Sequence, residues 1–258
     1  MKRRHRVTQE EWIYVWDNYE KLVDKPALMK KAKKTVDKIV DVCKGKKVAY
    51  AWSGGKDSVV LALLCEQAGI HDGMGAYSDL FFKSTIKHLF LTKPNGVELI
   101  HTGHNMDWLF QNQKYLFMDN MFAWYKMTHL KAQEEYYNRN KLDFLIKGKR
   151  TQDDNVVKSD LIYTSKRGYS EFNPINDWTH EEVIAYMRYN GKTLSPFYFT
   201  KHGFHYGDCD WASMNVTEEI GDINGMWEYI ESIDRSVVLE AAKGIDSARE
   251  YLRQKIEL

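Results

Sequence analysis

One short loop constrains the fold of this chain more than any other part of its sequence. Before the loop, residues 48–52 form an apolar run rich in strand formers. After it, residues 59–65 are apolar almost all round, which is typical of a helix packed on a sheet. The loop itself consists of Ser53, Gly54, Gly55, Lys56, Asp57 and Ser58. This order of strand, glycine loop and helix predicts the opening of a βαβ unit.

The loop has the chemistry of a phosphate-binding site. Its two glycines let the backbone turn tightly, so that successive N–H groups point at one ligand near the positive end of the helix. Lys56 adds a full positive charge, and Ser53 and Ser58 add hydroxyl donors. Asp57 would be repelled by bare phosphate, and a Mg²⁺ ion that bridges it to the phosphates is the simplest reason for its presence. The alternative is a glycine turn that only connects the strand to the helix.

The rest of the sequence continues the alternation of strands and helices. Further strands are predicted at 73–77, 97–101 and 142–146, and a strand or hairpin at 161–173. Helices are predicted near 84–91, along the aromatic stretch 106–140, and after Thr179, which forms a capping box with Glu182. The pattern predicts an α/β fold with a doubly wound, mainly parallel, Rossmann-like sheet.

Helices without strands are expected at both ends of the chain. Residues 8–44 look helical on both sides of Pro26, and two more helices are predicted at 216–232 and 235–256. We therefore divide the chain into an N-terminal helical segment, a nucleotide-binding α/β domain and a C-terminal helical extension, at residues 1–45, 46–212 and 213–258.

Composition excludes several classes of protein. The net charge is +1, so nucleic acid could be attracted only by a local basic patch. The cysteines Cys43, Cys65 and Cys209 stand far apart, which excludes a four-cysteine cluster and favours a reducing, cytoplasmic location. No run of about 20 apolar residues is present, so no membrane partner is expected. Aromatic residues make up 14% of the chain, and this surplus suggests a homo-oligomer.

The loop resembles the signature of the PP-loop ATP pyrophosphatase superfamily, the adenine nucleotide alpha hydrolase-like proteins. Its similarity to the PAPS-reductase-like branch extends over residues 46–212 and includes the segments 146–150, 173–178 and 194–209. The resemblance implies that ATP, or a PAPS-like adenine nucleotide, is bound with Mg²⁺. It also implies phosphate contacts from the segment after the strand at 142–146, namely Gly148, Lys149 and Arg150.

The sequence departs from that branch at its reactive cysteines. Sulfonucleotide reductases attack sulfur with a cysteine in a C-terminal Glu-Cys-Gly type motif, but no cysteine follows Cys209 in this chain. Iron–sulfur versions need a cysteine at the position that Ala212 occupies. The resemblance therefore implies the fold and the nucleotide site more strongly than it implies sulfate reduction.

Three functions are consistent with these motifs. In the first, the chain is an enzyme that adenylates a second substrate and releases pyrophosphate, for sulfur or nitrogen transfer. Lys56 and Arg150 would stabilise charge on the phosphates, and Asp57 would hold Mg²⁺. The second substrate is left open among a tRNA or DNA base, a small carboxylate and a protein. The second function is a PAPS reductase or sulfotransferase, and the third is a non-catalytic adenine-nucleotide-binding module. Asp57 favours catalysis.

Other polar residues have a functional and a structural interpretation. His202, His205 and Cys209 share a loop and could hold zinc, but their spacing matches no closed zinc site and favours loop packing. Cys209 could also be a nucleophile that carries sulfur, against an inert buried thiol. His101 and His104 follow a predicted strand, so they either line the nucleotide crevice or form an ordinary turn.

Three further features of the sequence concern the binding of a nucleotide or nucleic acid. Ser78 and Asp79 follow a predicted strand and could contact the adenosine moiety. The lysines Lys30, Lys31, Lys33 and Lys34 favour a solvated helix face over a nucleic-acid patch. The aromatic and basic residues of 106–140 could stack on nucleic acid, but aromatic residues at helical spacing are more often part of a core.

Overall fold

The structure is a computed structural model that describes residues 8–117, 121–153, 162–164, 168–206, 210–216 and 220–256. The side chains of residues 121, 122, 205 and 206 lie outside this description. The prediction for Cys209, and the zinc site that would combine it with the His205 side chain, fall outside the described residues.

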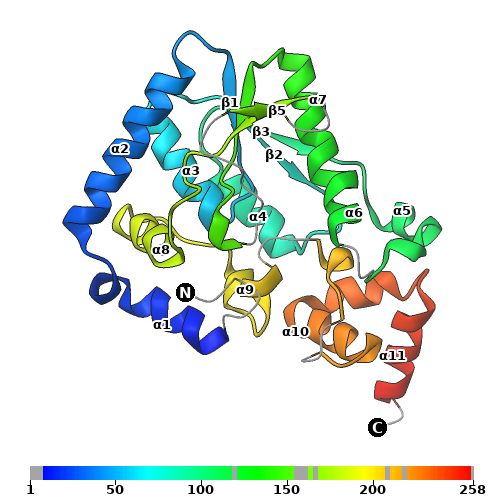
Figure 1. The fold of residues 1–258 in the computed structure, drawn as a ribbon. Helices are drawn as coiled ribbons and strands as arrows, with labels where there is room; N and C mark the ends of the chain where they lie inside the picture. The colour runs from blue at the N-terminus through cyan, green and yellow to red at the C-terminus, as the bar shows by residue number, and fades with distance from the viewer. Residues whose placement is uncertain are drawn as a thin grey trace.

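A six-stranded sheet organises the molecule (Figure 1). Its strand order is β3-β2-β1-β4-β6-β5, and every neighbouring pair is parallel except β5 with β6. The strands are β1 (Val48–Ala51), β2 (Gly73–Tyr77), β3 (Val97–His101), β4 (Phe144–Ile146), β5 (Tyr163–Thr164) and β6 (Ser170–Phe172). The predicted α/β fold with a mainly parallel sheet is confirmed.

The strand order reverses between β1 and β4, which places two loops side by side. β1 pairs with β2 on one edge and with β4 on the other, with Tyr50 opposite Ile146. The chain leaves β1 into residues 53–58 and leaves β4 into residues 147–150. Because the carboxyl ends of parallel strands lie at one edge of the sheet, both loops meet at the switch point where such folds bind ligands.

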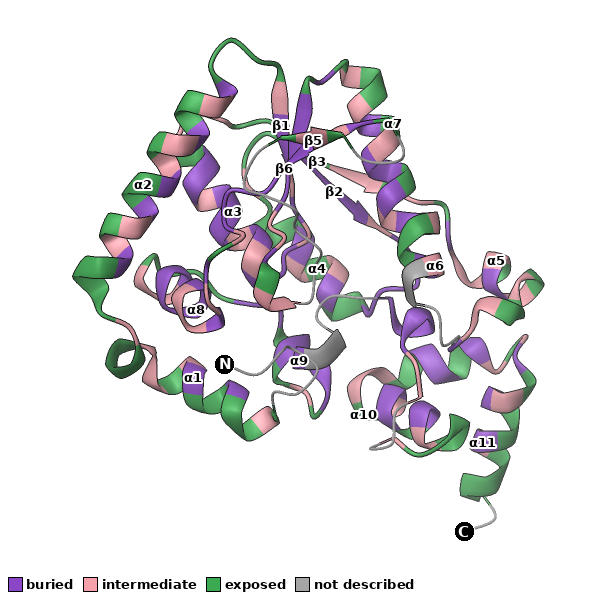
Figure 2. Cartoon of the chain, in the orientation of Figure 1, coloured by how far each residue is buried: buried purple, intermediate pink, exposed green. Residues whose placement is uncertain are grey.

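Helices cover both faces of the sheet (Figure 1). One face is covered by α2 (Lys25–Cys43), α3 (Lys56–Gln67), α4 (Lys83–Thr92) and α8 (His180–Tyr189), and the other by α7 (Lys131–Asn140). Figure 2 shows that α3 is largely buried. Val60, Leu61 and Leu64 have no exposed surface, which is why the sequence of α3 is apolar on nearly every side.

The aromatic stretch 106–140, predicted to be helical, forms several helical segments and not one continuous helix. The described chain forms α5 (Met106–Gln111), α6 (Met121–Tyr125), a π-helical turn (Lys126–Leu130) and α7. Trp108, Leu109 and Trp124 pack in a hydrophobic core with the C-terminal helices, whereas Ala132 and Tyr136 pack on the sheet. The stretch therefore serves two cores that lie in different directions, and one straight helix could not reach both.

The C-terminal helices α10 (Ile223–Ala241) and α11 (Asp246–Ile256) pack on a core of their own. That core includes Trp211, Trp227 and the residues Leu80 and Phe82, which follow β2. The boundary predicted at 232–235 is present as a kink, since Asp234 has non-helical backbone angles within α10. The helix predicted at 235–256 is wrong as one element, because α10 ends at Ala241 and α11 begins at Asp246. The division at residues 45 and 212 stays a prediction. Within the described residues, no helix has the length and hydropathy needed to cross a bilayer.

Candidate functional site

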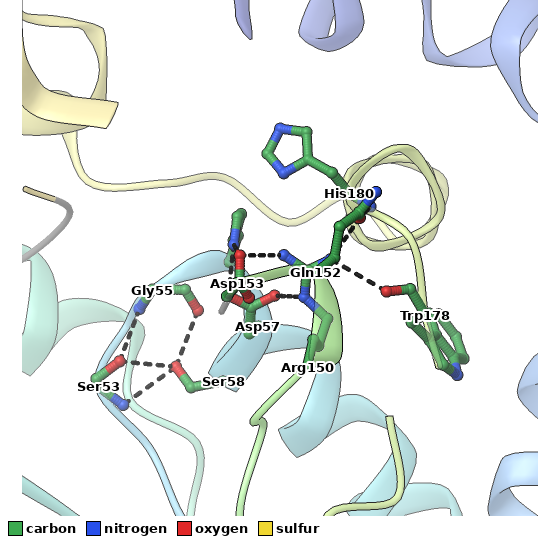
Figure 3. Close-up of polar contacts among 10 residues, drawn as sticks. Ser53, Gly55, Asp57, Ser58, Arg150, Gln152, Asp153, Trp178 and His180 are labelled. Atoms are coloured by element: carbon green, nitrogen blue, oxygen red, sulfur yellow. Dashed lines mark hydrogen bonds and ion pairs between the residues drawn. The ribbon is translucent and has the colours of Figure 1, made fainter. Parts of the chain in front are cut away.

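The loop after β1 is held in a compact turn by its own serines. The Ser53 amide donates to Ser58 Oγ at 3.1 Å, and Ser58 Oγ donates to the Gly55 carbonyl at 2.9 Å (Figure 3). Gly54 has a φ of +78°, and a Cβ built there would lie 2.6 Å from Leu89 Cδ2. The positive φ therefore favours glycine at residue 54, and a side chain there would also displace the Leu89 side chain of α4.

The first turn of α3 has no side-chain cap. Its N-cap residue is Gly55, which has no side chain to accept a capping hydrogen bond. The first N–H groups of a helix have no partner within the helix and point outward along its axis. With the partial positive charge of the helix end, these N–H groups form a site suited to an anion.

A network of four charged groups lies against this turn. Arg150, which has no exposed surface, places Nε 2.6 Å from Asp57 Oδ1 and Nη2 2.8 Å from Asp153 Oδ1 (Figure 3). Lys56 Nζ lies 2.5 Å from Asp57 Oδ2 and 3.8 Å from Asp153 Oδ1. Among the described residues, two cations thus face two carboxylates. This balance offsets the high cost of burying an unpaired guanidinium.

The fold brings these groups together because the segment after β4 approaches α3 closely. A Cβ at Gly148 would lie 3.2 Å from the Asp57 carbonyl oxygen, tighter than most side-chain contacts. Glycine therefore lets the backbone pass α3 and carry Arg150 to Asp57. Arg150 Nη1 also donates to the Trp178 carbonyl at 3.1 Å, which ties the site to the start of α8.

Two residues of the site were missed by sequence reasoning. Asp153 contacts both Lys56 and Arg150. Gln152 Oε1 accepts hydrogen bonds from the His180 amide at 2.5 Å and from Arg150 Nη1 at 3.3 Å. The only signal was their place directly after the basic segment, where a carboxylate three residues beyond an arginine can pair with it.

Lys149 lies in a different environment from Arg150. Its Nζ is 2.6 Å from Glu171 Oε2, and the Tyr163 hydroxyl donates to the same oxygen at 2.8 Å. Glu171 is opposite Leu145, whose neighbours Ala132 and Tyr136 belong to α7 and its core. The Lys149 ammonium is therefore on the α7 side of the sheet, whereas the Arg150 guanidinium is beside α3. A phosphate contact from Lys149 stays a prediction.

The donor set fits a magnesium ion that arrives with a nucleotide. Among the described residues there is no group of three or more histidine, cysteine or acidic side chains that could hold a metal ion alone. Mg²⁺ needs only one or two protein carboxylates when phosphate oxygens and water complete its octahedron. Asp57 lies in the first turn of α3, and Asp153 pairs with the same arginine, so these carboxylates meet that requirement.

The other candidate residues, at the same edge of the sheet, make hydrogen bonds or ion pairs with neighbouring side chains. Ser78 Oγ donates to the buried Asp210 carboxylate at 2.7 Å, and Trp124 Nε1 donates to its other oxygen at 2.8 Å. His101 Nε2 lies 3.1 Å from Asp79 Oδ1. Burial, with smaller contributions from Lys131 and His101, lowers the pKa of His104 below its ordinary value. Their roles toward a nucleotide stay predictions.

His202 and the lysines of α2 lie outside this edge of the sheet, and their contacts are structural. The His202 ring packs edge-on against Tyr229 with 5.2 Å between ring centroids. On α2, Lys31 lies 2.8 Å from Glu182 and Lys33 lies 3.1 Å from Asp37. The exposed Lys33 pair agrees with the interpretation of a solvated face, whereas Lys31 is 25% exposed and links α2 to α8.

The strand order and the uncapped glycine loop at the switch point define an α/β protein of the PP-loop class. The chain belongs to the family of the phosphoadenosine phosphosulfate reductase domain, whose sequence profile matches residues 47–225. The resemblance inferred from the loop is thereby confirmed. None of the curated proteins matches this sequence.

One solved structure shares this fold at low identity, and two others are less similar. The phosphoadenylyl-sulfate reductase from Candida auris, in a phosphate complex, is 11% identical, with a TM-score of 0.51 over 67% of this chain and 90% of that one. The NMN synthetase from Francisella tularensis is 14% identical, with a TM-score of 0.48 over 88% of this chain and 93% of that one. The NH3-dependent NAD synthetase from Campylobacter jejuni is 16% identical, with a TM-score of 0.46 over 87% and 95%. At these identities the likeness concerns the fold alone.

Proposed function

We propose that this protein is an enzyme that binds ATP with Mg²⁺ at residues 53–58 and transfers the adenylyl group to a second substrate, releasing pyrophosphate. One observation carries the proposal: Lys56 lies in the first turn of α3, and the segment after β4 brings the buried Arg150 to Asp57 in the same turn. Backbone N–H groups and two buried cations together are what a polyphosphate chain requires.

The charges of the site suit the departure of pyrophosphate. A nucleophilic oxygen of the second substrate forms a bond to the α-phosphorus, while the bond from that phosphorus to the oxygen bridging to the β-phosphate breaks. Pyrophosphate keeps the electron pair of the broken bond, and a proton on the nucleophile passes to solvent. Lys56 and Arg150 stabilise the negative charge that grows on the departing phosphates.

Asp57 exchanges partners when the nucleotide binds. In the structure its two oxygens hold Lys56 and Arg150. Asp57, with Asp153 beside it, would hold the incoming Mg²⁺, and this frees both cations to turn toward the phosphates. When bound, the metal would neutralise part of the negative charge of the phosphates. The balanced network thus keeps Arg150 buried until a ligand replaces its carboxylate partner.

A second candidate is a reductase or sulfotransferase that acts on PAPS. The family of the matching domain favours it. The sequence after Cys209 contains no cysteine to attack sulfur, which disfavours it. A non-catalytic adenine-nucleotide-binding module would use the same loop without turnover. We also propose a reducing, cytoplasmic setting, because Cys43 and Cys65 are free and buried. A nucleic-acid base as second substrate and a homo-oligomer stay predictions.

The substitution Lys56→Ala tests the adenylation reaction. Wild-type protein is incubated with Mg²⁺ and α-labelled ATP, with water, tRNA, DNA or mixed carboxylates as acceptor, and AMP and pyrophosphate are measured. The loss of a cation that stabilises the leaving group should lower pyrophosphate release by about 100-fold or more. Lys31→Ala, which removes a lysine from α2, is the control and should leave the rate unchanged.

Three results would contradict or redirect the proposal. Turnover of Lys56→Ala at the wild-type rate would exclude the mechanism. Release of ADP and phosphate in place of AMP and pyrophosphate would exclude attack at the α-phosphorus. Sulfite formed from PAPS and a thiol would establish the second candidate, and tight ATP binding without turnover with every acceptor would favour the third.

A further inference from the structure

A pocket of about 690 Å³ lies on the α3 side of the sheet. It is lined by Tyr50 of β1 and the following Trp52, by one face of α3, and by the turns that follow α4 and α8. Residues 53–58 and 147–153, all of which the structure describes, are not among its lining residues. The pocket is therefore distinct from the phosphate loop, and its volume is typical of a small-molecule site.

The buried part of this pocket carries no charged side chain. Its buried lining residues are Tyr50, Trp52 and Ala62, whereas its charged lining residues, Glu66, Lys93 and Lys192, are exposed to solvent. Two aromatic rings therefore provide most of the buried surface. A ligand that fills this part meets apolar and aromatic groups, which favour an uncharged planar molecule.

Tyr50 brings one polar group into the buried part. Its ring lies over Gly73 of β2, where a built Cβ would be 3.0 Å from Tyr50 Cζ, the carbon that carries the hydroxyl. The same Cβ would lie 3.0 Å from Val97 Cγ2, at the start of β3. The hydroxyl end of the ring thus reaches across β2 toward β3, which directly follows the turn that lines the pocket after α4.

The Tyr50 hydroxyl has no hydrogen-bond partner among the residues that the structure describes. Tyr186 is the contrasting case, because its hydroxyl accepts from Gln67 Nε2 at 2.7 Å. Both tyrosines are 2% exposed. A buried tyrosine hydroxyl usually has a partner, and leaving one unpaired costs free energy. The hydroxyl of Tyr50 is therefore a donor or acceptor that a ligand can use.

The surroundings of this hydroxyl decide which role it takes. Burial raises the pKa of Tyr50, and nearby acidic groups, among them Cys65, Glu66 and Asp72, raise it further. The hydroxyl therefore keeps its proton and donates. The same carboxylates would repel an anion at this position. The complementary group on a ligand is a neutral acceptor, such as a ring nitrogen.

Trp52 connects the pocket with the phosphate loop. Its indole is 3% exposed and lies between two glycines. A Cβ built on Gly54 would be 3.7 Å from Trp52 Cη2, and one built on Gly75 would be 3.5 Å from Trp52 Cε3. Gly54 belongs to the loop that follows β1. A molecule that packs on Trp52 in the pocket therefore contacts the side chain on which this loop rests.

We propose that this pocket is a regulatory site for a small uncharged molecule with a planar heteroaromatic ring, which accepts a hydrogen bond from the Tyr50 hydroxyl and packs on Trp52. Its binding is coupled to nucleotide binding, because Trp52 supports Gly54 of the phosphate loop. The inference goes beyond the proposed function, since it adds a second site that takes no part in adenylation.

Crystals of the full chain soaked with 3-bromoquinoline test the site itself. This probe is uncharged at the pH of the crystals, its ring nitrogen is an acceptor, and its bromine is located by anomalous scattering. We expect the ring nitrogen about 3 Å from Tyr50 Oη. The anionic 4-bromobenzoate is soaked in parallel and should be missing from the pocket. A pocket without 3-bromoquinoline, or a benzoate carboxylate on Tyr50, would overturn the inference.

Tyr186 offers a matched control for Tyr50, since it is equally buried and its hydroxyl is paired. Tyr50→Phe should weaken the calorimetric affinity for 3-bromoquinoline about tenfold, the effect of one lost hydrogen bond, and Tyr186→Phe should leave it unchanged. In the absence of the probe, Tyr186→Phe should lower Tm and Tyr50→Phe should not. An equal fall of Tm in both variants would mean that the Tyr50 hydroxyl is paired within the chain, and would overturn the inference.

Calorimetry with α,β-methylene-ATP, an analogue that cannot release pyrophosphate, tests the coupling. A filled pocket restrains Trp52, so the loop loses less freedom when the nucleotide binds. We expect saturating 3-bromoquinoline to raise the affinity for the analogue about fivefold, and the analogue to raise the affinity for 3-bromoquinoline by the same factor. A change of less than about twofold would overturn the regulatory role.

Failure of the proposed function has a different signature. If the reaction were not adenylation, the pocket would still bind 3-bromoquinoline and still change the affinity for the analogue. If the analogue did not bind at all, the proposed function and the coupling would both fail, while the crystals would still show the probe on Tyr50. An empty pocket together with AMP and pyrophosphate release would refute this inference and leave the proposed function standing.

Discussion

Two helices that border the site, α3 and α8, begin in opposite ways. The first turn of α8 is closed by a complete capping box, in which Thr179 accepts from the Glu182 amide and Glu182 accepts from the Thr179 amide. The first turn of α3 follows Gly55 and has no such cap. A cap contributes stability and pairs N–H groups that could otherwise bind a ligand, whereas a first turn without a side-chain cap leaves them for an anion. The chain thus keeps one helix end for structure and the other for binding.

Arg150 joins the two helix starts, and its substitution should have the largest effect. It contacts Asp57 in α3 and the Trp178 carbonyl just before α8. Arg150→Met would leave the Asp57 and Asp153 carboxylates without their buried partner. We expect a loss of about 3–5 kcal/mol in the free energy of unfolding, measured by urea denaturation, together with loss of pyrophosphate release.

An exposed arginine provides the control for this experiment. Arg139 pairs with Glu98 on the surface and is 56% exposed. Arg139→Met should cost less than about 1 kcal/mol, because exposed ion pairs contribute little. If Arg150→Met were as stable as Arg139→Met, the buried network would not hold the two helix starts together.

Removing the cap of α8 should affect stability and leave nucleotide binding alone. Thr179→Ala removes the oxygen that accepts from the Glu182 amide. We expect a loss of about 1 kcal/mol in the free energy of unfolding and a calorimetric affinity for α,β-methylene-ATP within about twofold of wild type. Thr179→Ser keeps the oxygen and should restore the stability. A weakened affinity in Thr179→Ala would show that the two helix ends are not independent.

Adding a cap to α3 should have the opposite effect. Gly55 has φ −74° and ψ 158°, a conformation that serine adopts without strain. Gly55→Ser should change the free energy of unfolding by only a few tenths of a kcal/mol. Its hydroxyl would compete with phosphate for the first-turn N–H groups, and we expect the affinity for α,β-methylene-ATP to fall about tenfold.

Gly55→Ala separates the added cap from simple crowding. It introduces a Cβ without an oxygen, so it should weaken binding less than Gly55→Ser does. Equal losses in both variants would attribute the effect to space alone. Undiminished binding in both would remove the first turn of α3 from the phosphate site.

The local elements could be read from the sequence because their causes lie within a few residues. The strand–loop–helix unit and the capping box of Thr179 and Glu182 depend on neighbours along the chain, and both are present. The helical character of 106–140 was also predicted, but its breaks were not, because they follow from packing against two different hydrophobic cores. Asp153 and Gln152 were missed for a similar reason, since their partners Lys56 and His180 are distant in the sequence.

The sequence by itself determined that this protein is a mainly parallel α/β fold with a phosphate-type loop at the start of a buried helix. Glycine conformation, helix ends and apolar periodicity act over short distances, so the amino-acid order is enough to read them. Only the tertiary structure decided that neighbouring Lys149 and Arg150 serve different sides of β4. Sheet pairing selects the carboxylate that each cation meets, Glu171 for the first and Asp57 for the second, and that choice depends on which strands become neighbours.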